Sequence, residues 1–399
     1  MRGIIYWTLT ALAISAVYQS FLSNFLFVIL GIGRGMQTID DFPWTCTRLH
    51  HPLLEGCEHM WLDHDGRKLY GACTSATSRA GWNPGGNKYN LSARARTDHV
   101  SVLDIDQPGS DGLYGLRQLK VSGYQGELDL HGFDVRRLGN TLRFWMINHR
   151  PPIDDSTGDF LDPKVFGANS TIEIFDLDYA SETLKHVKTI FSNVIISPNG
   201  LAVEADGVGF VITNDHDAKV GAFRDLEMLY GSGSLAYCRS DTGECHIAAK
   251  NGFAFPNGIA SDRNGFYYVA HSVTGIVTVH QLQNGSLNRV DEIPLGYPID
   301  NLSMDAEGSL IAAAIPDVLG FTKASEDPYN LVAPATVLSV NGVVSQLQSG
   351  ARQYDIAKIV EDKHGTALPT ITVTLHDVKS NRLFLAGGFS PFLGICEKQ

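Results

Sequence analysis

The sequence has little charge of either sign, and what it has is mostly acidic. Charged residues make up only 19% of the 399 residues, and 31 Lys and Arg stand against 43 Asp and Glu, for a net charge of −12. No basic cluster interrupts this acidic average. The sequence therefore argues against a nucleic-acid-binding protein, which needs a basic face to displace counterions.

The sequence motifs of several large enzyme classes are also absent. The chain contains no G-x-S-x-G elbow, no H-E-x-x-H pair, no Walker loop and no dinucleotide-binding fingerprint. No C-x-x-C pair indicates a zinc ribbon. The composition argues against a disordered chain or a coiled coil, because 44% of the residues are hydrophobic and the 40 glycines suit many short strands and turns.

An uncharged segment of 31 residues, 3–33, lies near the N-terminus. Two interpretations of residues 1–35 fit. One is a cleaved secretory signal peptide with its apolar region at residues 4–17. The other is an uncleaved signal anchor, since about 20 apolar residues cross a bilayer and apolar residues resume after Asn24. Both place residues 40–399 in the secretory pathway, either extracellular or membrane-anchored on the lumenal or extracellular side.

The six cysteines and four glycosylation sequons agree with that compartment. Six cysteines allow 15 pairings, so spacing alone leaves the pairing open. Two pairs of cysteines flank turn sequences, Cys57 with Cys73 and Cys238 with Cys245. A third pair, Cys46 and Cys396, lies at the two ends of the domain. We predict glycans at three sequons in loop-like sequence, Asn90, Asn169 and Asn284.

One sequence unit recurs between residues 40 and 399. It consists of a polar residue, a few apolar residues, a turn containing Gly, Asp or Asn, and a dense apolar strand. Five copies begin at residues 58, 131, 199, 257 and 300, and a sixth is matched from His376. Each copy is typical of a β-hairpin, and further strand-like segments lie between copies. About four strands in each of six units predict one all-β domain, a six-bladed β-propeller over residues 40–399.

The polar residue that begins each copy is the candidate for chemistry. In a propeller the innermost strand of each blade begins near the axis, so these residues point into the central channel. Two carboxylates and three amides recur at the same phase of the repeat. Their oxygens are ligands that Ca²⁺ prefers, whereas an isolated Asn-Gly is more often a turn. The candidate metal ligands are Glu58, Asn199, Asn257, Asp300 and Asn301.

Three histidines occupy related positions. His131 begins the second copy, where it is either a hydrogen-bonded channel residue or a general base acting on water. His149 follows the next strand and is either its partner or a surface residue at a strand end. His216 ends the corresponding strand of the third copy.

With these residues in place, the chain resembles the serum paraoxonase/arylesterase family of calcium-dependent hydrolases, and more distantly gluconolactonases and strictosidine synthase-like propellers. The resemblance covers about residues 40–399. It is carried by Cys-Glu-His-Met at 57–60, Leu-His-Gly-Phe at 130–133, Ile-Asn-His at 147–149, Ser-Pro-Asn-Gly at 197–200, Thr-Asn-Asp-His at 213–216, Phe-Pro-Asn-Gly-Ile at 255–259, Ile-Asp-Asn-Leu-Ser at 299–303 and the closing Cys-Glu at 396–397.

The resemblance implies roles for these residues. Glu58, Asn199, Asn257, Asp300 and Asn301 take the positions of the family's catalytic-calcium ligands, His131 that of the water-activating base, and His149 that of its partner. Cys46 and Cys396 match the family's end-to-end disulfide. The sequon at Asn301 should then stay unmodified, because a glycan cannot occupy the channel.

The sequence departs from the family at a second, structural calcium. The two acidic residues that hold this ion are replaced by His59 and Gly200. The resemblance therefore implies one catalytic calcium and leaves a second one unsupported, unless backbone carbonyls such as those of Phe133 and Asp215 compensate.

The expected function is calcium-dependent hydrolysis of lactones or aryl esters, with water activated by His131. An apolar channel rim is predicted from Phe133, Phe253, Phe255 and Phe389, and it favours a small lipophilic substrate. Two alternatives remain open from the sequence. One is a non-catalytic, calcium-stabilised propeller that binds a protein or a lipophilic ligand, and the other is a strictosidine synthase-like enzyme. The oligomeric state is not predicted.

Overall fold

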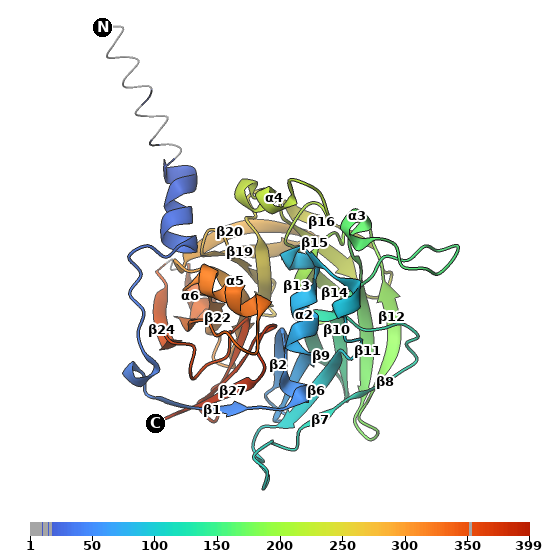
Figure 1. Cartoon of the computed structure of the whole chain (residues 1–399), viewed down its shortest axis with the longest axis horizontal. Helices are drawn as coiled ribbons and strands as arrows, with labels where there is room; N and C mark the ends of the chain where they lie inside the picture. The colour runs from blue at the N-terminus through green and yellow to red at the C-terminus, as the bar shows by residue number, and fades with distance from the viewer. Residues whose placement is uncertain (1–9, 11–14, 16–17, 351–352) are drawn as a thin grey trace.

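The structure is a computed structural model that describes residues 10, 15, 18–350 and 353–399. Six antiparallel blades surround a central axis (Figure 1), so the predicted six-bladed β-propeller is confirmed. Most of the predicted apolar region at residues 4–17 lies outside the described residues. No helix within the described ranges is long and apolar enough to cross a membrane.

The blades follow one another along the chain, each starting at the axis. The first is β2 (His59–Asp63), β3 (Lys68–Cys73), β6 (His99–Asp104) and β7 (Arg117–Gln118). The second is β9 (Leu130–Leu138), β10 (Thr141–Arg150), β11 (Asn169–Asp178) and β12 (Thr183–Ile190), with β8 (Lys120–Ser122) added in parallel at its edge. The third is β13 (Pro198–Val203), β14 (Gly209–Asn214), β15 (Ser234–Arg239) and β16 (Cys245–Lys250).

The remaining blades repeat the pattern. The fourth is β17 (Pro256–Ser261), β18 (Phe266–His271), β19 (Ile276–Gln283) and β20 (Ser286–Pro294). The fifth is β21 (Ile299–Met304), β22 (Leu310–Ala314), β23 (Ala335–Asn341) and β24 (Asp355–Asp362). The sixth is β25 (Val373–Asp377), β26 (Arg382–Ala386), β27 (Leu393–Lys398) and β1 (Trp44–Leu49).

The sixth blade joins the two ends of the chain. Its outermost strand, β1, comes from the N-terminal side and pairs antiparallel with β27, so that Cys46 lies opposite Cys396. A disulfide links these two residues across a sequence separation of 350. Disulfides also join Cys57 to Cys73 and Cys238 to Cys245, so no cysteine is free. The end-to-end bond covalently closes the ring of blades.

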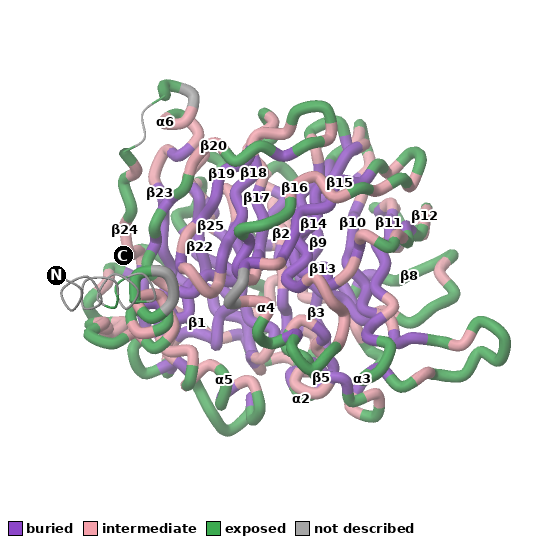
Figure 2. The backbone as a smooth tube through the Cα atoms, turned by 90° about the horizontal axis from the view of Figure 1, so that it is seen from above, coloured by how far each residue is buried: buried purple, intermediate pink, exposed green. Residues whose placement is uncertain are grey.

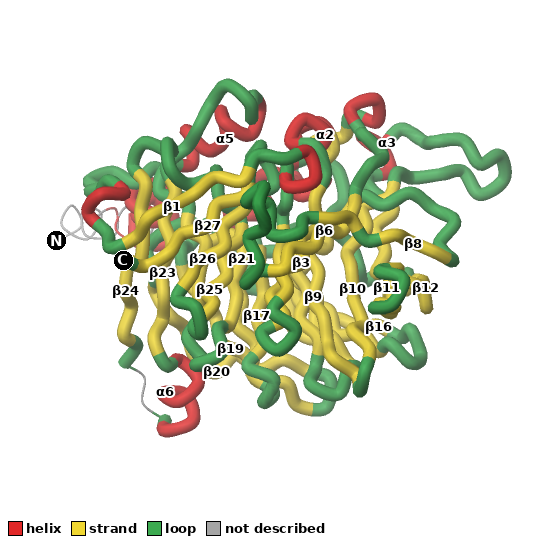
Figure 3. The backbone as a smooth tube through the Cα atoms, turned by 90° about the horizontal axis from the view of Figure 1, so that it is seen from below, coloured by secondary structure: helices red, strands yellow, loops and turns green. Residues whose placement is uncertain are grey.

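The propeller has two faces, which we name by the course of its innermost strands, β2, β9, β13, β17, β21 and β25. These strands begin at the head face and end at the far face. Loops at the head face carry α2 (Ala76–Gly81), α3 (Pro163–Phe166), α4 (Arg224–Tyr230) and α5 (Val318–Glu326), whereas α6 (Val343–Ser349) lies at the far face (Figures 2 and 3).

Shorter segments complete the chain. They are the π-helical η1 (Tyr18–Leu22) and η2 (Asn24–Ile29), the 3₁₀ turns η3 (Ile39–Asp41), η4 (Pro52–Leu54), η5 (Pro84–Gly86) and η6 (Leu91–Ala93), and the small hairpin β4 (Trp82–Asn83) and β5 (Lys88–Tyr89).

Apolar residues fill the space between neighbouring blades (Figure 2). The cluster between blades one and two, for example, contains Tyr70, Phe133 and Phe144, which are at most 1% exposed. Near the axis the blades converge, and small residues such as Ala312, Ala313 and Ala314 of β22 fit there. This packing holds the innermost strands in fixed positions, which is what a site at their ends requires.

Candidate functional site

The polar residues that begin the sequence repeats meet at the head face. Glu58 directly precedes β2, and His131, Asn199, Asn257 and the Asp300–Asn301 pair lie in the first residues of β9, β13, β17 and β21. Each of these side chains is buried, with 2–7% of its surface exposed. The fold therefore brings the whole predicted set to one end of the channel.

The sixth blade differs from the sequence-based prediction. The sixth copy was matched from His376, but that residue lies near the far end of β25. The position equivalent to Glu58 directly precedes β25 and belongs to Thr372, which is 1% exposed. Its hydroxyl hydrogen-bonds the Glu58 backbone carbonyl at 3.1 Å and Oε2 at 3.2 Å. The repeat was missed there because Thr372 carries neither a carboxylate nor an amide.

A shared irregularity turns the head residues toward the axis. The strand registers shift between Pro198 and Leu201 in β13, and at the equivalent positions in β17 and β21. A bulge of this kind re-aims side chains. The following glycine permits close strand packing, because a Cβ at Gly258 would lie 2.4 Å from the Cα of Asn301. The Asn-Gly pairs are thus bulges inside strands and not turns.

Direct contacts link four of the five predicted metal ligands. The Asn301 amide nitrogen lies 3.3 Å from Oε1 of Glu58 and 3.3 Å from Oδ1 of Asp300. Asn257 lies near enough to Asp300 to lower the pKa of that carboxylate, and its amide nitrogen donates a hydrogen bond to Ser272 Oγ at 3.2 Å. Asn199 belongs to the third blade, next to the blade of Asn257, and its amide nitrogen lies 3.4 Å from Oδ2 of Asp215.

Two oxygens of this set are buried without any hydrogen-bond partner, Oδ1 of Asn199 and Oδ1 of Asn257. An unpaired buried acceptor costs about 1–3 kcal/mol, so such atoms are uncommon in folded proteins. Amide oxygens beside carboxylates suit a hard cation such as Ca²⁺. The residues present therefore fit a calcium ion.

The two carboxylates are held close to one another at an energetic cost. Burial raises the pKa of Glu58, although Arg79 opposes this rise. Burial also raises the pKa of Asp300 well above its ordinary value, and the neighbouring charge of Glu58 raises it further. No group of three His, Cys, Asp or Glu side chains arranged to hold a metal occurs among the described residues. A cation here would depend on the amide oxygens as much as on the acids.

Arg79 is a residue of the site that sequence reasoning missed. It lies in α2, is 4% exposed, and donates hydrogen bonds to the carbonyls of Leu130 at 2.6 Å and Gly56 at 3.3 Å. These bonds hold a positive charge between the starts of β2 and β9, close to Glu58. No repeat marks this position, because α2 belongs to a loop found in only one blade.

His131 and His149 form a buried pair. Their ring centroids are 5.0 Å apart in an edge-to-face arrangement. His149 Nδ1 lies 2.9 Å from the Ser170 hydroxyl, and His149 Nε2 and His131 Nδ1 have no partner. Burial lowers the pKa of His131 well below its usual value, with His149 and Arg79 adding to the effect, and burial lowers that of His149 to about 3. Both imidazoles are therefore neutral at pH 7.

The third blade contributes a buried cluster of Asp215, His216 and Arg224 at the head face. His216 Nδ1 lies 2.7 Å from Oδ1 of Asp215, and both side chains are buried. Arg224 lies 3.7 Å from the same carboxylate oxygen. Burial would raise the pKa of Asp215, but His216 and Arg224 outweigh it and lower that pKa. Asp215 thereby stays ionised beside Asn199, and neither it nor Arg224 was predicted as a side-chain participant.

The predicted apolar rim is wrong for two of its four residues. Phe133 and Phe253 are buried in the core, at 1% and 4% exposure. Phe255 packs edge-on against His216 with centroids 5.2 Å apart, and Phe389 packs against Phe321. Of the four predicted rim residues, Phe255 and Phe389 are the two that are half-buried at the head face.

The sequons differ in accessibility. Asn90 and Asn284 are exposed, Asn169 is half-buried, and Asn301 is 2% exposed inside the channel. Glycosylation at the first three remains a prediction, and the burial of Asn301 supplies the steric reason for expecting none there.

Comparison with known proteins gives a consistent result. The model of the family described as Arylesterase matches residues 163–374, just over half of the chain. Serum paraoxonase/lactonase 3 of Homo sapiens is 26% identical over 255 residues, which cover 60% of this chain and 66% of that protein. Serum paraoxonase/arylesterase 1 of Rattus norvegicus is 27% identical over 212 residues, 52% of this chain and 56% of the relative. The chain thus spans less than two thirds of the length of these relatives.

Solved structures with similar folds are more distant in sequence. Luciferin-regenerating enzyme is 12% identical, with a TM-score of 0.49, over 89% of this chain and 95% of that one. A gluconolactonase from Xanthomonas campestris is 16% identical, with a TM-score of 0.43, over 89% of this chain and 100% of that one.

Proposed function

Because this chain belongs to the arylesterase family, we propose that it hydrolyses small lipophilic carboxylic esters or lactones with the help of one calcium ion. The proposal rests chiefly on one observation. Two buried amide oxygens, of Asn199 and Asn257, have no hydrogen-bond partner and stand in the same ring of head residues as two carboxylates. A cation is the ligand that these oxygens lack.

The residues that would hold the ion are Glu58, Asn199, Asn257, Asp300 and Asn301. When bound, calcium would supply Lewis-acid polarisation of the substrate carbonyl and stabilise negative charge on its oxygen. Glu58 and Asp300 provide the negative charge that selects a cation. Their raised pKa values reflect burial and mutual repulsion, which a positive charge relieves.

His131 is the proposed base. Its low pKa keeps the imidazole unprotonated at neutral pH, so it can accept a proton from water without first losing one. Since Nδ1 is buried and unpartnered, we assign the transfer to Nε2. The water oxygen bonds to the carbonyl carbon, the ester C–O bond breaks, and the proton returns from His131 to the departing alkoxide.

His149 is proposed as a positioning residue. Its ring packs edge-to-face against His131 while Nδ1 contacts Ser170, which limits how the His131 ring can rotate. A fixed ring keeps Nε2 directed at the reacting water. No covalent intermediate is required, in keeping with the absence of a nucleophile motif.

The proposed setting is the secretory pathway. All six cysteines are paired, which is typical of proteins that mature in an oxidising compartment. A signal peptide or anchor at residues 1–35 remains a prediction.

The function is tested with a panel of γ- and δ-lactones and phenyl acetate, assayed with calcium and with excess chelator. Hydrolysis should require calcium. His131→Gln should keep the calcium-induced rise in melting temperature but lose about 10²–10⁴-fold in kcat/KM, the usual contribution of a general base. The matched control is His246→Gln, a histidine on the outer strand β16, which should behave as wild type.

Two results would contradict the proposal. Equal turnover by His131→Gln and wild type would remove the base assignment. Calcium-dependent melting without turnover on any substrate would instead indicate a non-catalytic, calcium-stabilised propeller.

A further inference from the structure

A cavity opens at the far face, at the other end of the same innermost strands. Its volume is about 360 Å³, within the range of small-molecule pockets. It is lined by strand ends and the turns after them, including Ser261 and Met304. At about 3.3 Å per residue, Ser261 is about 13 Å along β17 from Asn257. This end of the cavity lies well away from the head-face site, whereas its inner end reaches His59 and Leu302, which directly follow Glu58 and Asn301 in the sequence.

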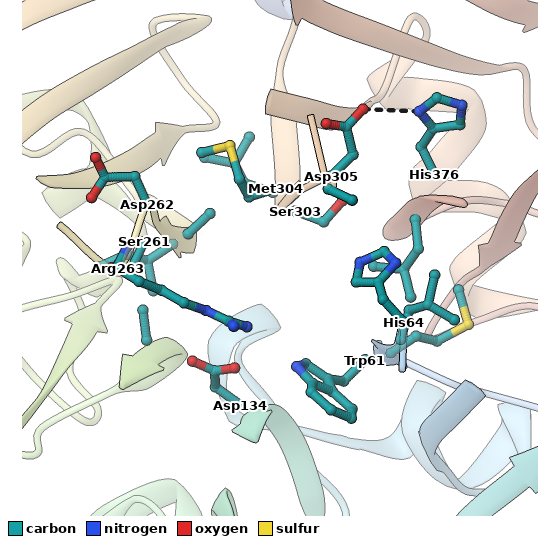
Figure 4. A pocket seen from close by; sticks show the side chains of 18 of the residues that line it. Trp61, His64, Asp134, Ser261, Asp262, Arg263, Ser303, Met304, Asp305 and His376 are labelled. Atoms are coloured by element: carbon teal, nitrogen blue, oxygen red, sulfur yellow. Dashed lines mark hydrogen bonds and ion pairs between the residues drawn. The ribbon is translucent and has the colours of Figure 1, made fainter. Parts of the chain in front are cut away.

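The cavity wall combines aromatic, basic and acidic side chains (Figure 4). Trp61 and His64 come from the first blade, Asp134 from the second, Arg263 from the fourth, and Asp305 from the fifth. Figure 4 shows the Arg263 side chain extending across the cavity toward Trp61, with the Asp134 carboxylate near its tip. His376 comes from the sixth blade, so every blade except the third contributes a polar or aromatic side chain to the cavity.

The acidic groups that face this cavity already have protein partners. Asp134 accepts hydrogen bonds from the backbone amides of Val135 at 2.8 Å and Val203 at 2.9 Å, and forms an ion pair with Arg136 at 2.9 Å. Asp305 accepts from two backbone amides of its own turn and lies 2.9 Å from Nδ1 of His376. These carboxylates have little capacity left for a ligand's donor groups.

One further acid, Asp262, is less completely paired. Its Oδ1 accepts hydrogen bonds from the backbone amides of Asn264 and Phe266, whereas its Oδ2 is buried without a partner. Figure 4 shows its carboxylate directed away from the Arg263 guanidinium. It does not compete for a ligand bound between Arg263 and Trp61.

Three other donor groups of the cavity, in contrast, are free. Among the described residues, the Arg263 guanidinium makes no hydrogen bond or ion pair, and neither do the Trp61 indole N–H and the His64 ring. Although much of the Arg263 surface is exposed, desolvation by the surrounding walls lowers the pKa of its guanidinium, nearby Arg136 lowers it further, and the Asp134 carboxylate opposes both effects. A charged fork with five N–H donors and no acceptor is an incomplete binding element.

We propose that this cavity binds a small organic carboxylate with an aromatic or apolar body. The guanidinium fork matches a carboxylate in bidentate geometry, and the indole N–H offers a further donor. The rings of Trp61 and the thioether of Met304 provide apolar wall for the rest of the molecule. Three neighbouring carboxylates disfavour a second negative charge, so a monoanion is preferred to a phosphate dianion.

The experiment is isothermal titration of the full chain with phenylacetate, compared with neutral phenylacetamide and dianionic phenyl phosphate. Phenylacetate should bind and both comparison compounds should bind more weakly. Arg263→Gln should raise the Kd for phenylacetate about tenfold or more, the usual cost of a lost charge-assisted hydrogen bond. Arg263→Lys keeps the charge but not the fork, so its Kd should lie between those of wild type and Arg263→Gln.

Two controls separate this site from the others. Arg239→Gln removes an exposed arginine that pairs with Asp241 on the third blade, and it should leave the Kd unchanged. His131→Gln, at the head face, should also leave the Kd unchanged, which distinguishes this cavity from product binding at the proposed hydrolytic site. The inference is overturned if phenylacetate does not bind at millimolar concentration, if phenylacetamide binds equally well, or if Arg263→Gln and Arg263→Lys both bind as wild type while His131→Gln does not.

Discussion

The two ends of the same six strands differ in how their innermost carboxylates are paired. At the far end, acidic residues are matched with basic ones across neighbouring blades, as in the 2.6 Å ion pair of Arg67 with Asp377 and the 2.7 Å ion pair of Arg137 with Asp63. At the head end, Glu58 and Asp300 repel one another, and two amide oxygens have no partner. The core packing between the blades is common to both ends, so the difference lies in the polar residues alone.

The polar residues at the head end lower the free energy of unfolding, and those at the far end raise it. Paired charges between blades favour the folded ring. Like charges and unpaired acceptors oppose folding, and they persist only where the surrounding packing enforces them, as is common at functional sites. If the comparison is correct, substitutions at the head end should change activity, and substitutions at the far end should change stability.

The largest expected effect is that of Asp300→Asn on activity. Removing one of two carboxylates should lower kcat/KM about 100-fold or more, since even outer-shell partners of metal ligands contribute 10–100-fold. The amide is nearly isosteric and relieves the repulsion with Glu58, so the melting temperature without calcium should not fall. Asp377→Asn is the matched far-end variant, and it should melt earlier while keeping wild-type kcat/KM. A pair of variants that both lose activity, or both lose only stability, would contradict the comparison.

The second expected effect is calcium-dependent stability. A ligand that binds only the folded state at 100 times its Kd adds about 2.7 kcal/mol to the free energy of unfolding. Differential scanning calorimetry should show a higher melting temperature with calcium, lost on adding chelator and absent in Asp300→Asn. Asp377→Asn should melt at a lower temperature without calcium and should show the same calcium-induced rise in melting temperature as wild type. An increment that survives in Asp300→Asn would place the ion elsewhere.

The parts of the fold and of the candidate site that could be predicted from the sequence are those that recur in every blade. The head residues of five blades were found because the same phase of the repeat carries an acid, an amide or a histidine each time. The propeller followed from the same six copies. The sixth head, Thr372, broke the chemical pattern, so the match began four residues late at His376.

What the sequence did not predict comes from segments that occur once. Arg79 lies in α2 and Arg224 in α4, and neither loop has a counterpart in other blades. The free Arg263 follows Asp262 in a hairpin turn, a sequence that indicates only a turn. Contacts between such segments depend on the three-dimensional closure of the ring, which no local pattern specifies.

The smallest expected effect is at the far end, in acid. Burial alone would raise the pKa of Asp377, but hydrogen bonds from Arg67 and Ser380 outweigh this and lower it to about 2. An unfolded Asp titrates near 3.9, so the pair contributes stability above about pH 4 and loses it as the pH falls toward 2.

Urea unfolding of wild type and Arg67→Gln at several pH values would measure this contribution. The difference in free energy of unfolding should be on the order of 1 kcal/mol at pH 6, since the partly exposed Arg67 is screened by water, and it should shrink toward zero near pH 2. Lys379→Gln is a control from the same turn between β25 and β26 that should show no such pH dependence. A constant difference from pH 6 to pH 2 would mean that Arg67 acts through packing and not through its charge, and the far end would then not be the electrostatically matched region that the comparison requires.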